Sequence, residues 1–264
     1  MPARTRAALS GHDLLLTAAG TTFYAALAVV PLLVVAIRSA SWVLGPQQVR
    51  RFAGSTGASL PSALGADQIP PTLAAAALEL NPLLVLVAVL PASLYGEGLR
   101  RSFATLSGVP EQASGWRGRL APVPVLLVAP FLLMGVLAST PLLAELRGST
   151  LASTLLGSYV ALNVGWVVVS LPLTWAFRGI APRTPSWRLS LVGGFTTGAF
   201  VSGFLQGFVL FLSLPIDLAA PFGGIDVVGA TCALLLWVWV LHIVVLVGYV
   251  ATCTLEELLH PAAA

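Results

Sequence analysis

The chain has 264 residues, of which 57% are hydrophobic and only 9% charged, and its mean hydropathy is +0.93. So few polar side chains cannot coat a soluble globule of this size, which excludes an ordinary water-soluble domain. The formal net charge is +3, and every basic residue apart from histidine is Arg. Because these arginines are scattered over loops without interleaved aromatic residues, they do not indicate nucleic-acid binding.

Six long apolar stretches without a charged residue follow one another along the chain. A helix rising about 1.5 Å per residue crosses a hydrocarbon core of about 30 Å in roughly 20 residues, and continuous apolar runs favour helices over membrane strands. The second stretch, Leu80 to Gly96, reaches this length only if it is extended back toward Thr72. We therefore predict an all-α polytopic membrane protein, a six-transmembrane-helix bundle with kinked helices that forms a single domain over residues 1–264. The approximate spans are 14–37, 73–96, 120–144, 150–177, 189–214 and 227–254.

The first stretch begins with Arg4 and Arg6 and superficially resembles a secretory signal. Its apolar run of 24 residues is longer than the apolar region of a signal peptide, which has about 7 to 15 residues, so we expect it to be retained as the first span. Thr17, Thr21 and Tyr24 lie along one side of this helix, where their hydroxyl groups can bond backbone carbonyls. Tyr24 is also a candidate substrate contact.

The segment from Arg38 to Glu79 joins the first span to the second and is rich in Gly, Ser, Pro and Ala. Small residues of this kind allow a loop either to dip back toward the membrane or to stay mobile, and both alternatives are open at this point.

The loop after the second span carries candidate contacts for an anionic group. Glu97 and Arg101 stand four residues apart in the favourable order for a salt bridge, while Arg100 and Arg101 can clamp a phosphate with paired hydrogen bonds. A structural salt bridge beside the membrane interface is the alternative interpretation. We also expect a short amphipathic helix on the membrane surface, because apolar residues recur at i, i+4 and i+7 (Leu99, Phe103, Leu106).

The arginines predict the orientation of the bundle. With six spans, one side carries nine of them and the other carries four. The excess of positive charge marks the cytoplasmic side, so both termini are expected in the cytoplasm, with anionic lipid headgroups as partners on that face. The richer side holds Arg4, Arg6, Arg100, Arg101, Arg117, Arg119, Arg178, Arg183 and Arg188, and the poorer side holds Arg38, Arg50, Arg51 and Arg147.

Three polar residues inside the predicted spans are further candidate contacts, because each one costs free energy in a membrane. His242 lies near the middle of the last span and shares a face with Trp239 and Tyr249. It could bind a headgroup or relay protons, and a neutral histidine bonded to another helix is the more common alternative. Asn163 and Gln206 are more often interhelical hydrogen-bond partners than ligands.

Small residues at four-residue spacing predict close packing between the fourth and fifth spans. Homodimerisation through the same faces is the alternative. Prolines at 31, 91, 130 and 172 are expected to kink four of the helices. The small residues are Gly157, Ala161 and Gly165 in the fourth span, with Gly194, Gly198 and Ser202, and Ala199, Gly203 and Gly207, on two faces of the fifth.

Enzyme signatures are absent from the sequence, which has no H-E-x-x-H, C-x-x-C, G-x-S-x-G or Walker A pattern. We expect no catalytic residue, no metal site and no cofactor. The two cysteines, Cys232 and Cys253, are interpreted as small apolar fillers. Without an ATP site, any transport would be passive, ion-coupled or driven by a partner.

Three segments carry a resemblance to a known family. They are Phe23-Tyr24 followed by Pro31 in the first span, the run from Leu94 to Arg101, and Phe222-Gly223-Gly224 followed by Leu234 to Trp239 and by Gly248. Together they resemble the YihY/BrkB family of bacterial inner-membrane proteins, and its actinobacterial members in particular. The chain departs from the family pattern where Val29 or Ala28 replaces a serine, where an Asn-rich segment is absent, and where Tyr249-Val250 replaces Ala-Glu.

The resemblance implies a six-span protein of the bacterial cytoplasmic membrane. Members of the family have been labelled ribonuclease BN and have also been linked to serum resistance and envelope lipid export. The residues oppose the nuclease label, because the sequence contains no cluster of metal-binding carboxylates or histidines.

These observations favour an integral membrane protein, not an enzyme, that transports or handles an envelope lipid or another amphiphile. A non-transporting scaffold for envelope-assembly partners, in which the chain binds a partner protein or a second copy of itself, is the second hypothesis. Ion or proton transport centred on His242 is the third. The candidate substrate or headgroup contacts are Tyr24, Glu97, Arg100, Arg101, Asn163, Gln206 and His242.

Overall fold

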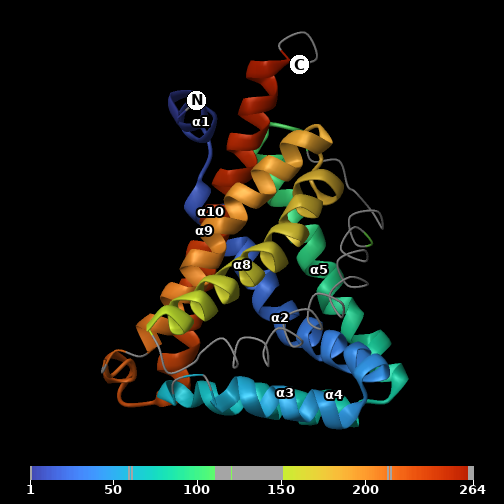
Figure 1. The fold of residues 1–264 in the computed structure, drawn as a ribbon. Helices are drawn as coiled ribbons and strands as arrows, with labels where there is room; N and C mark the ends of the chain where they lie inside the picture. The colour runs from blue at the N-terminus through green and yellow to red at the C-terminus, as the bar shows by residue number, and fades with distance from the viewer. Residues whose placement is uncertain are drawn as a thin grey trace.

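Figure 1 shows a computed structural model of the chain, in which residues 2–58, 60, 62–110, 120, 151–212, 214 and 216–260 are described. All regular structure in these residues is helical, as the composition predicts. The helices are α1 (Pro2–Leu9), α2 (Leu14–Leu44), α3 (Pro46–Ala58), η1 (Ala63–Gln68), α4 (Ile69–Glu79), α5 (Pro82–Leu106), α8 (Leu151–Trp175), the π-helical turn η2 (Ala176–Ile180), α9 (Trp187–Leu212), η3 (Ala220–Phe222) and α10 (Asp226–Leu259).

Four helical stretches of the described residues are long and apolar enough to cross a membrane. Many of their large apolar side chains are exposed on the surface of the chain, which is the arrangement expected when lipid is the solvent. The four stretches are Leu14–Leu44, Leu155–Ile180, Trp187–Leu212 and Asp226–Leu259. Of the predicted third span, 120–144, all but Leu120 lies outside the described residues.

The second predicted span differs from the structure at both ends. The chain leaves the helix at Leu80 and begins a new one at Pro82, because Asn81 caps α5: its side-chain oxygen accepts a hydrogen bond from the Leu84 amide at 2.9 Å. Helix α5 then continues to Leu106, so residues 73–79 belong to the separate helix α4 rather than to the span.

The prediction of a short amphipathic helix on the membrane surface is also wrong. Leu99, Phe103 and Leu106 are 4%, 0% and 2% exposed, because they form the last turns of α5 and face the core of the bundle. The apolar repeat at i, i+4 and i+7 marks a buried helix face as well as an interfacial one, and here it is buried.

The segment from Arg38 to Glu79 is ordered into the end of α2, α3, η1 and α4 where the structure describes it. Figure 1 shows α3 and α4 side by side across the end of the bundle that is remote from both termini. Arg38 fixes this corner, because its Nη1 donates a 3.2 Å hydrogen bond to the Leu78 carbonyl near the end of α4. A cation at the C-terminal end of a helix also interacts favourably with the helix dipole.

The long helices form two packed pairs, α2 with α5 and α8 with α9, and α10 packs against both α9 and α2. Figure 1 shows the pairs meeting near the termini and diverging toward α3 and α4. Helices α2 and α9 run away from the termini, whereas α5, α8 and α10 run toward them. We call the end with both termini the terminal end and the end crossed by α3 and α4 the distal end.

Small residues bring α8 and α9 together. A Cβ atom on Gly194 would overlap Thr174, one on Gly198 would overlap Ser170, and one on Gly165 would stand 3.6 Å from the Ser202 hydroxyl. Thus one of the two small faces of α9 is packed against α8. The other face is open: Gly203 has no atom within 4 Å of its added Cβ, and Gly207 meets only the edge of the Trp237 ring at 3.7 Å. Gly157 is buried on α8.

The hydrophobic core lies toward the terminal end, where the last turns of α5, the turn η2 and α10 converge. Its centre is an aromatic group of Phe103, Phe177 and Tyr249, with ring centroids 4.2 to 6.0 Å apart. All three side chains are fully buried. Aromatic contacts of this kind add about 0.5 to 1.5 kcal/mol beyond the burial of their surface.

Candidate functional site at the terminal end

The histidine at position 242 is buried among three helices. It is 5% exposed, and its Nδ1 lies 2.9 Å from the Val238 carbonyl and 3.1 Å from the Thr22 hydroxyl of α2. Its Nε2 lies 3.1 Å from the Tyr95 hydroxyl of α5. Because a carbonyl only accepts, Nδ1 carries a proton, and Nε2 of the neutral ring accepts from Tyr95. Both ring nitrogens therefore have protein partners. This arrangement favours the alternative role for His242, a neutral histidine bonded to another helix.

Other polar groups in the same layer are also bonded within the protein. The Thr21 hydroxyl lies 2.6 Å from that of Ser102, which joins α2 to α5 beside the histidine. Trp239, on the His242 face of α10, donates to the Leu15 carbonyl at 3.0 Å. Polar contacts of this kind hold membrane helices together at about 0.6 kcal/mol each on average.

Tyr24 contacts the neighbouring helix through its ring. A Cβ atom at Gly98 would overlap that ring, so the glycine is what allows α2 and α5 to approach here. Asn163 bonds the Tyr159 carbonyl of its own helix at 2.8 Å, and Gln206 is exposed on α9. The structure therefore does not bring Tyr24, Asn163 and Gln206 together with His242 into one site.

The arginine pair of α5 has protein partners as well. Arg101 Nε donates to Glu97 Oε1 at 2.9 Å, and Arg100 Nη1 donates to the Ile180 carbonyl at 3.3 Å. The first contact is the structural salt bridge foreseen as the alternative, and the second ties the end of α5 to the π-helical turn. These contacts favour structural roles for both guanidinium groups at the terminal end.

The end of α10 is fastened to the loop between α8 and α9. Glu256 Oε2 accepts hydrogen bonds from the Ser186 amide and hydroxyl, both at 2.9 Å, and so caps the start of α9. Glu257 Oε1 lies 2.7 Å from Arg183 Nη1, and the Tyr249 hydroxyl donates to the Arg183 carbonyl at 2.8 Å. These contacts hold the loop at a defined position at the terminal end of the bundle.

A cavity of about 260 Å³ opens beside this loop and beneath α1, and we call it the α1 cavity. Segments far apart in the sequence form its walls: α1, the turn before α2, the end of α5, the α8–α9 loop and the end of α10. Three basic side chains and one carboxylate line it. Its lining residues are Arg4, Ala8, His12, Leu106, Ser107, Gly108, Arg183, Val250, Cys253, Thr254 and Glu257.

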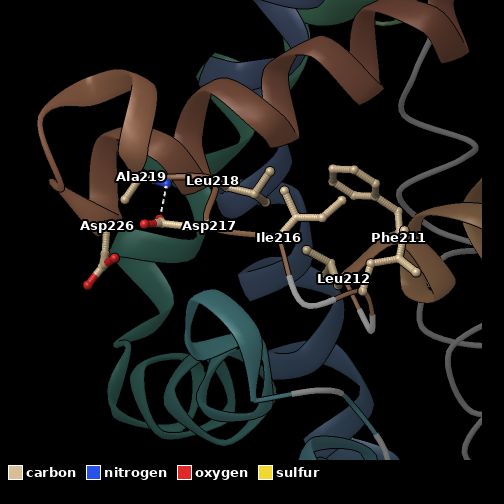
Figure 2. A pocket seen from close by; sticks show the side chains of 8 residues that line it. Phe211, Leu212, Ile216, Asp217, Leu218, Ala219 and Asp226 are labelled. Carbon is tan, nitrogen blue, oxygen red and sulfur yellow. Dashed lines mark hydrogen bonds between the residues drawn. The ribbon is translucent and has the colours of Figure 1, made fainter.

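A second cavity, of about 170 Å³, lies at the other end of α9 and α10. Figure 2 shows the apolar side chains of Phe211, Leu212 and Ile216 along it, with Asp217 and Asp226 on the opposite side. Asp217 already has partners within the protein, because its Oδ1 accepts hydrogen bonds from the backbone amides of Ala219 at 2.9 Å and Ala220 at 3.1 Å. This carboxylate shapes the turn that leads into α10.

Sequence reasoning missed the α1 cavity. Arg4 and Arg183 were counted for the orientation of the bundle, and neither His12 nor Glu257 was considered as part of a site. A signal existed in the charges alone, since Arg183, Glu256 and Glu257 flank the last two predicted spans on the same side. Their proximity to α1 depends on the tertiary fold. Within the described part of the chain, no group of three or more His, Cys, Asp or Glu residues could hold a metal ion.

Long apolar helices, polar side chains bonded between helices and charged groups gathered at the bundle ends together define an integral membrane protein of the helical class. The chain belongs to the virulence factor BrkB family, whose family model matches residues 5–263, nearly its whole length. Comparison with curated proteins and with solved structures finds no match.

Proposed function

We propose that this protein transports or handles an envelope lipid, or another amphiphile with an anionic headgroup, in the cytoplasmic membrane. The observation that carries the proposal is that two arginines, Arg4 and Arg183, line the α1 cavity at the terminal end, where this polar cavity meets exposed apolar surface of the helices. An amphiphile offers the matching combination of a negative headgroup and an apolar tail.

The interior of the bundle supports a lipid over an ion. The buried polar groups described at the centre, Thr21, Thr22, Tyr95, Ser102 and His242, are neutral and bond one another. An ion route through a membrane protein is usually marked by several ionisable residues that face a cavity. His242 is instead fixed by its three partners.

The proposal includes six crossings with both termini in the cytoplasm. Figure 1 shows α5 and α8 running in the same direction, which supports one further crossing between them. The predicted span 120–144 would supply that crossing. A C-terminal fusion to green fluorescent protein should fluoresce, and a fusion to alkaline phosphatase should be inactive; the reverse pattern would overturn the orientation.

The function is tested by reconstituting the purified protein in liposomes that carry a fluorescent phospholipid in both leaflets. Dithionite quenches only the outer leaflet, so transbilayer movement shows as loss of the protected fraction relative to protein-free vesicles. We expect this loss for anionic phosphatidylglycerol. Full protection, with and without an imposed proton gradient, would contradict transport, and a stable co-purifying envelope protein in that case would support the scaffold hypothesis.

A further inference from the structure

The α1 cavity has an excess of positive charge that the protein does not neutralise itself. Its lining holds Arg4 and Arg183 against the single carboxylate of Glu257. Arg183 is paired with Glu257, whereas Arg4 takes part in none of the ion pairs found among the described residues. An anionic ligand would complete the charge balance.

The donors come from separate segments of the chain. Arg4 lines the cavity from α1, and Arg183 lines it from the α8–α9 loop, where the Tyr249 hydroxyl holds the Arg183 backbone. Two arginines that line one cavity suit a phosphate, because each guanidinium group can donate paired hydrogen bonds to its oxygens.

Apolar side chains share the rest of the lining with Ser107, Cys253 and Thr254. Leu106 and Val250 are buried beside the cavity, and His12 comes directly before the start of α2. In the first turn of that helix, Leu15 and Leu16 are 55% and 69% exposed. A headgroup in the cavity would therefore stand next to a surface that acyl chains can cover.

We propose that the α1 cavity binds the phosphate group of a membrane lipid between Arg4 and Arg183, and that Glu257 competes with this phosphate for Arg183. The inference rests on the proposed function, since it names the headgroup class and the place where it binds. Helix α1 supplies one half of the binding charge, so α1 is part of the site and not only an N-terminal extension.

Binding is measured by isothermal titration calorimetry on the full chain in a non-ionic detergent. The probes are dihexanoyl phosphatidic acid, dihexanoyl glycerol, which has the same tails without phosphate, and inorganic phosphate. We expect saturable binding of the phosphatidic acid and none of the glycerol lipid. Inorganic phosphate should bind at least tenfold more weakly; equal affinity would overturn the lipid as the source of the phosphate.

Three variants locate the site. Arg4→Gln should weaken binding of phosphatidic acid about tenfold, the usual size for one charged hydrogen-bond donor. Arg6→Gln is the matched control, because Arg6 lies exposed on the same helix but does not line the cavity, and it should leave the affinity unchanged. Glu257→Gln should strengthen binding severalfold, because it frees the Arg183 guanidinium group while the Tyr249 hydroxyl still holds the Arg183 backbone.

The sign of the Glu257 effect distinguishes a site from general attraction of lipid to a basic protein. Equal losses in Arg4→Gln and Arg6→Gln would overturn the inference, and so would weaker binding in Glu257→Gln with an unchanged melting temperature. Binding with these signs but without lipid movement in liposomes would refute only the proposed transport. If Arg4→Gln changes neither lipid movement nor the binding of phosphatidic acid, only this site is refuted.

Discussion

The two ends of the bundle are built differently. At the terminal end, α5, η2 and α10 converge on the buried rings of Phe103, Phe177 and Tyr249, and charged side chains fasten the α8–α9 loop to α10. At the distal end the two helix pairs diverge, and α3 and α4 lie across them (Figure 1). Among the described residues, buried aromatic and charged contacts therefore join the helices at the terminal end, while the two pairs separate toward the distal end, and the following substitutions test this contrast.

The largest effect is expected from opening the terminal core. Phe103→Ala removes a fully buried ring and should lower the free energy of unfolding by about 3 to 5 kcal/mol. Phe23→Ala is the control, because Phe23 is 62% exposed on α2 and its loss should cost less than about 0.5 kcal/mol. Thermal unfolding in detergent, followed by a thiol-reactive dye, measures both. Equal shifts in the two variants would show that the terminal end is not the packed core.

A second test compares the two small faces of α9. Gly198→Leu would force a side chain into Ser170 of α8 and should destabilise the protein by about 1 to 3 kcal/mol. Gly203→Leu enters open space on the same helix and should have little effect. The melting temperatures of the two variants give the comparison. A larger loss in Gly203→Leu would mean that the open face is covered in the assembled protein, as the homodimer alternative requires.

The hydrogen-bonded layer around His242 should contribute less than the aromatic core and no more than the contact between α8 and α9. His242→Ala leaves the Tyr95 hydroxyl without its ring partner, while the Thr22 hydroxyl keeps its 2.8 Å hydrogen bond to the Ala18 carbonyl, so the cost should be about 1 to 3 kcal/mol; Tyr95→Phe should cost about 0.5 to 1.5 kcal/mol. His260→Ala, at the exposed end of α10, is the control. If Tyr95→Phe keeps its stability but abolishes a pH-dependent flux, the ion-transport hypothesis replaces the structural role.

The smallest effect concerns the cap that Glu256 provides for α9. Glu256→Ala removes both hydrogen bonds to Ser186 and should cost about 1 kcal/mol, as loss of a helix cap usually does. Hydrogen exchange of the first turn of α9 should rise, while exchange at the distal end of the same helix stays unchanged. Faster exchange at both ends would contradict the view that the two ends are held independently.

The sequence predicted the fold class and much of the helix layout, because apolar length and charge placement follow directly from the cost of desolvating polar groups. It gave the wrong bounds for the helix of the second predicted span, because extending the apolar stretch Leu80 to Gly96 back to residue 73 for spanning length crosses the break before Pro82. The true start carried its own local signal, Asn81 followed by Pro82, which is a typical helix beginning. The end was hidden because Glu97, Arg100 and Arg101 continue the helix beyond its apolar part.

The candidate site was less predictable than the fold. Two small faces of α9 look alike in the sequence, and only the packing shows that Gly198 is covered and Gly203 open. His242 could be recognised as a costly polar group, but its partners Thr22 and Tyr95 lie 220 and 147 residues away. The α1 cavity brings Arg4 and Arg183 together in the same way. Long-range proximity is a property of the tertiary fold and has no local pattern.

The most direct test of the proposed function compares headgroups in one reconstituted preparation. Vesicles of identical composition would carry trace fluorescent phosphatidylglycerol or trace fluorescent phosphatidylcholine, and the rate of transbilayer movement would be measured for each with wild-type protein and with Arg4→Gln. The account predicts faster movement of the anionic lipid, with that preference reduced in Arg4→Gln. Equal rates for both lipids in the wild-type protein, or no movement of either, would contradict it.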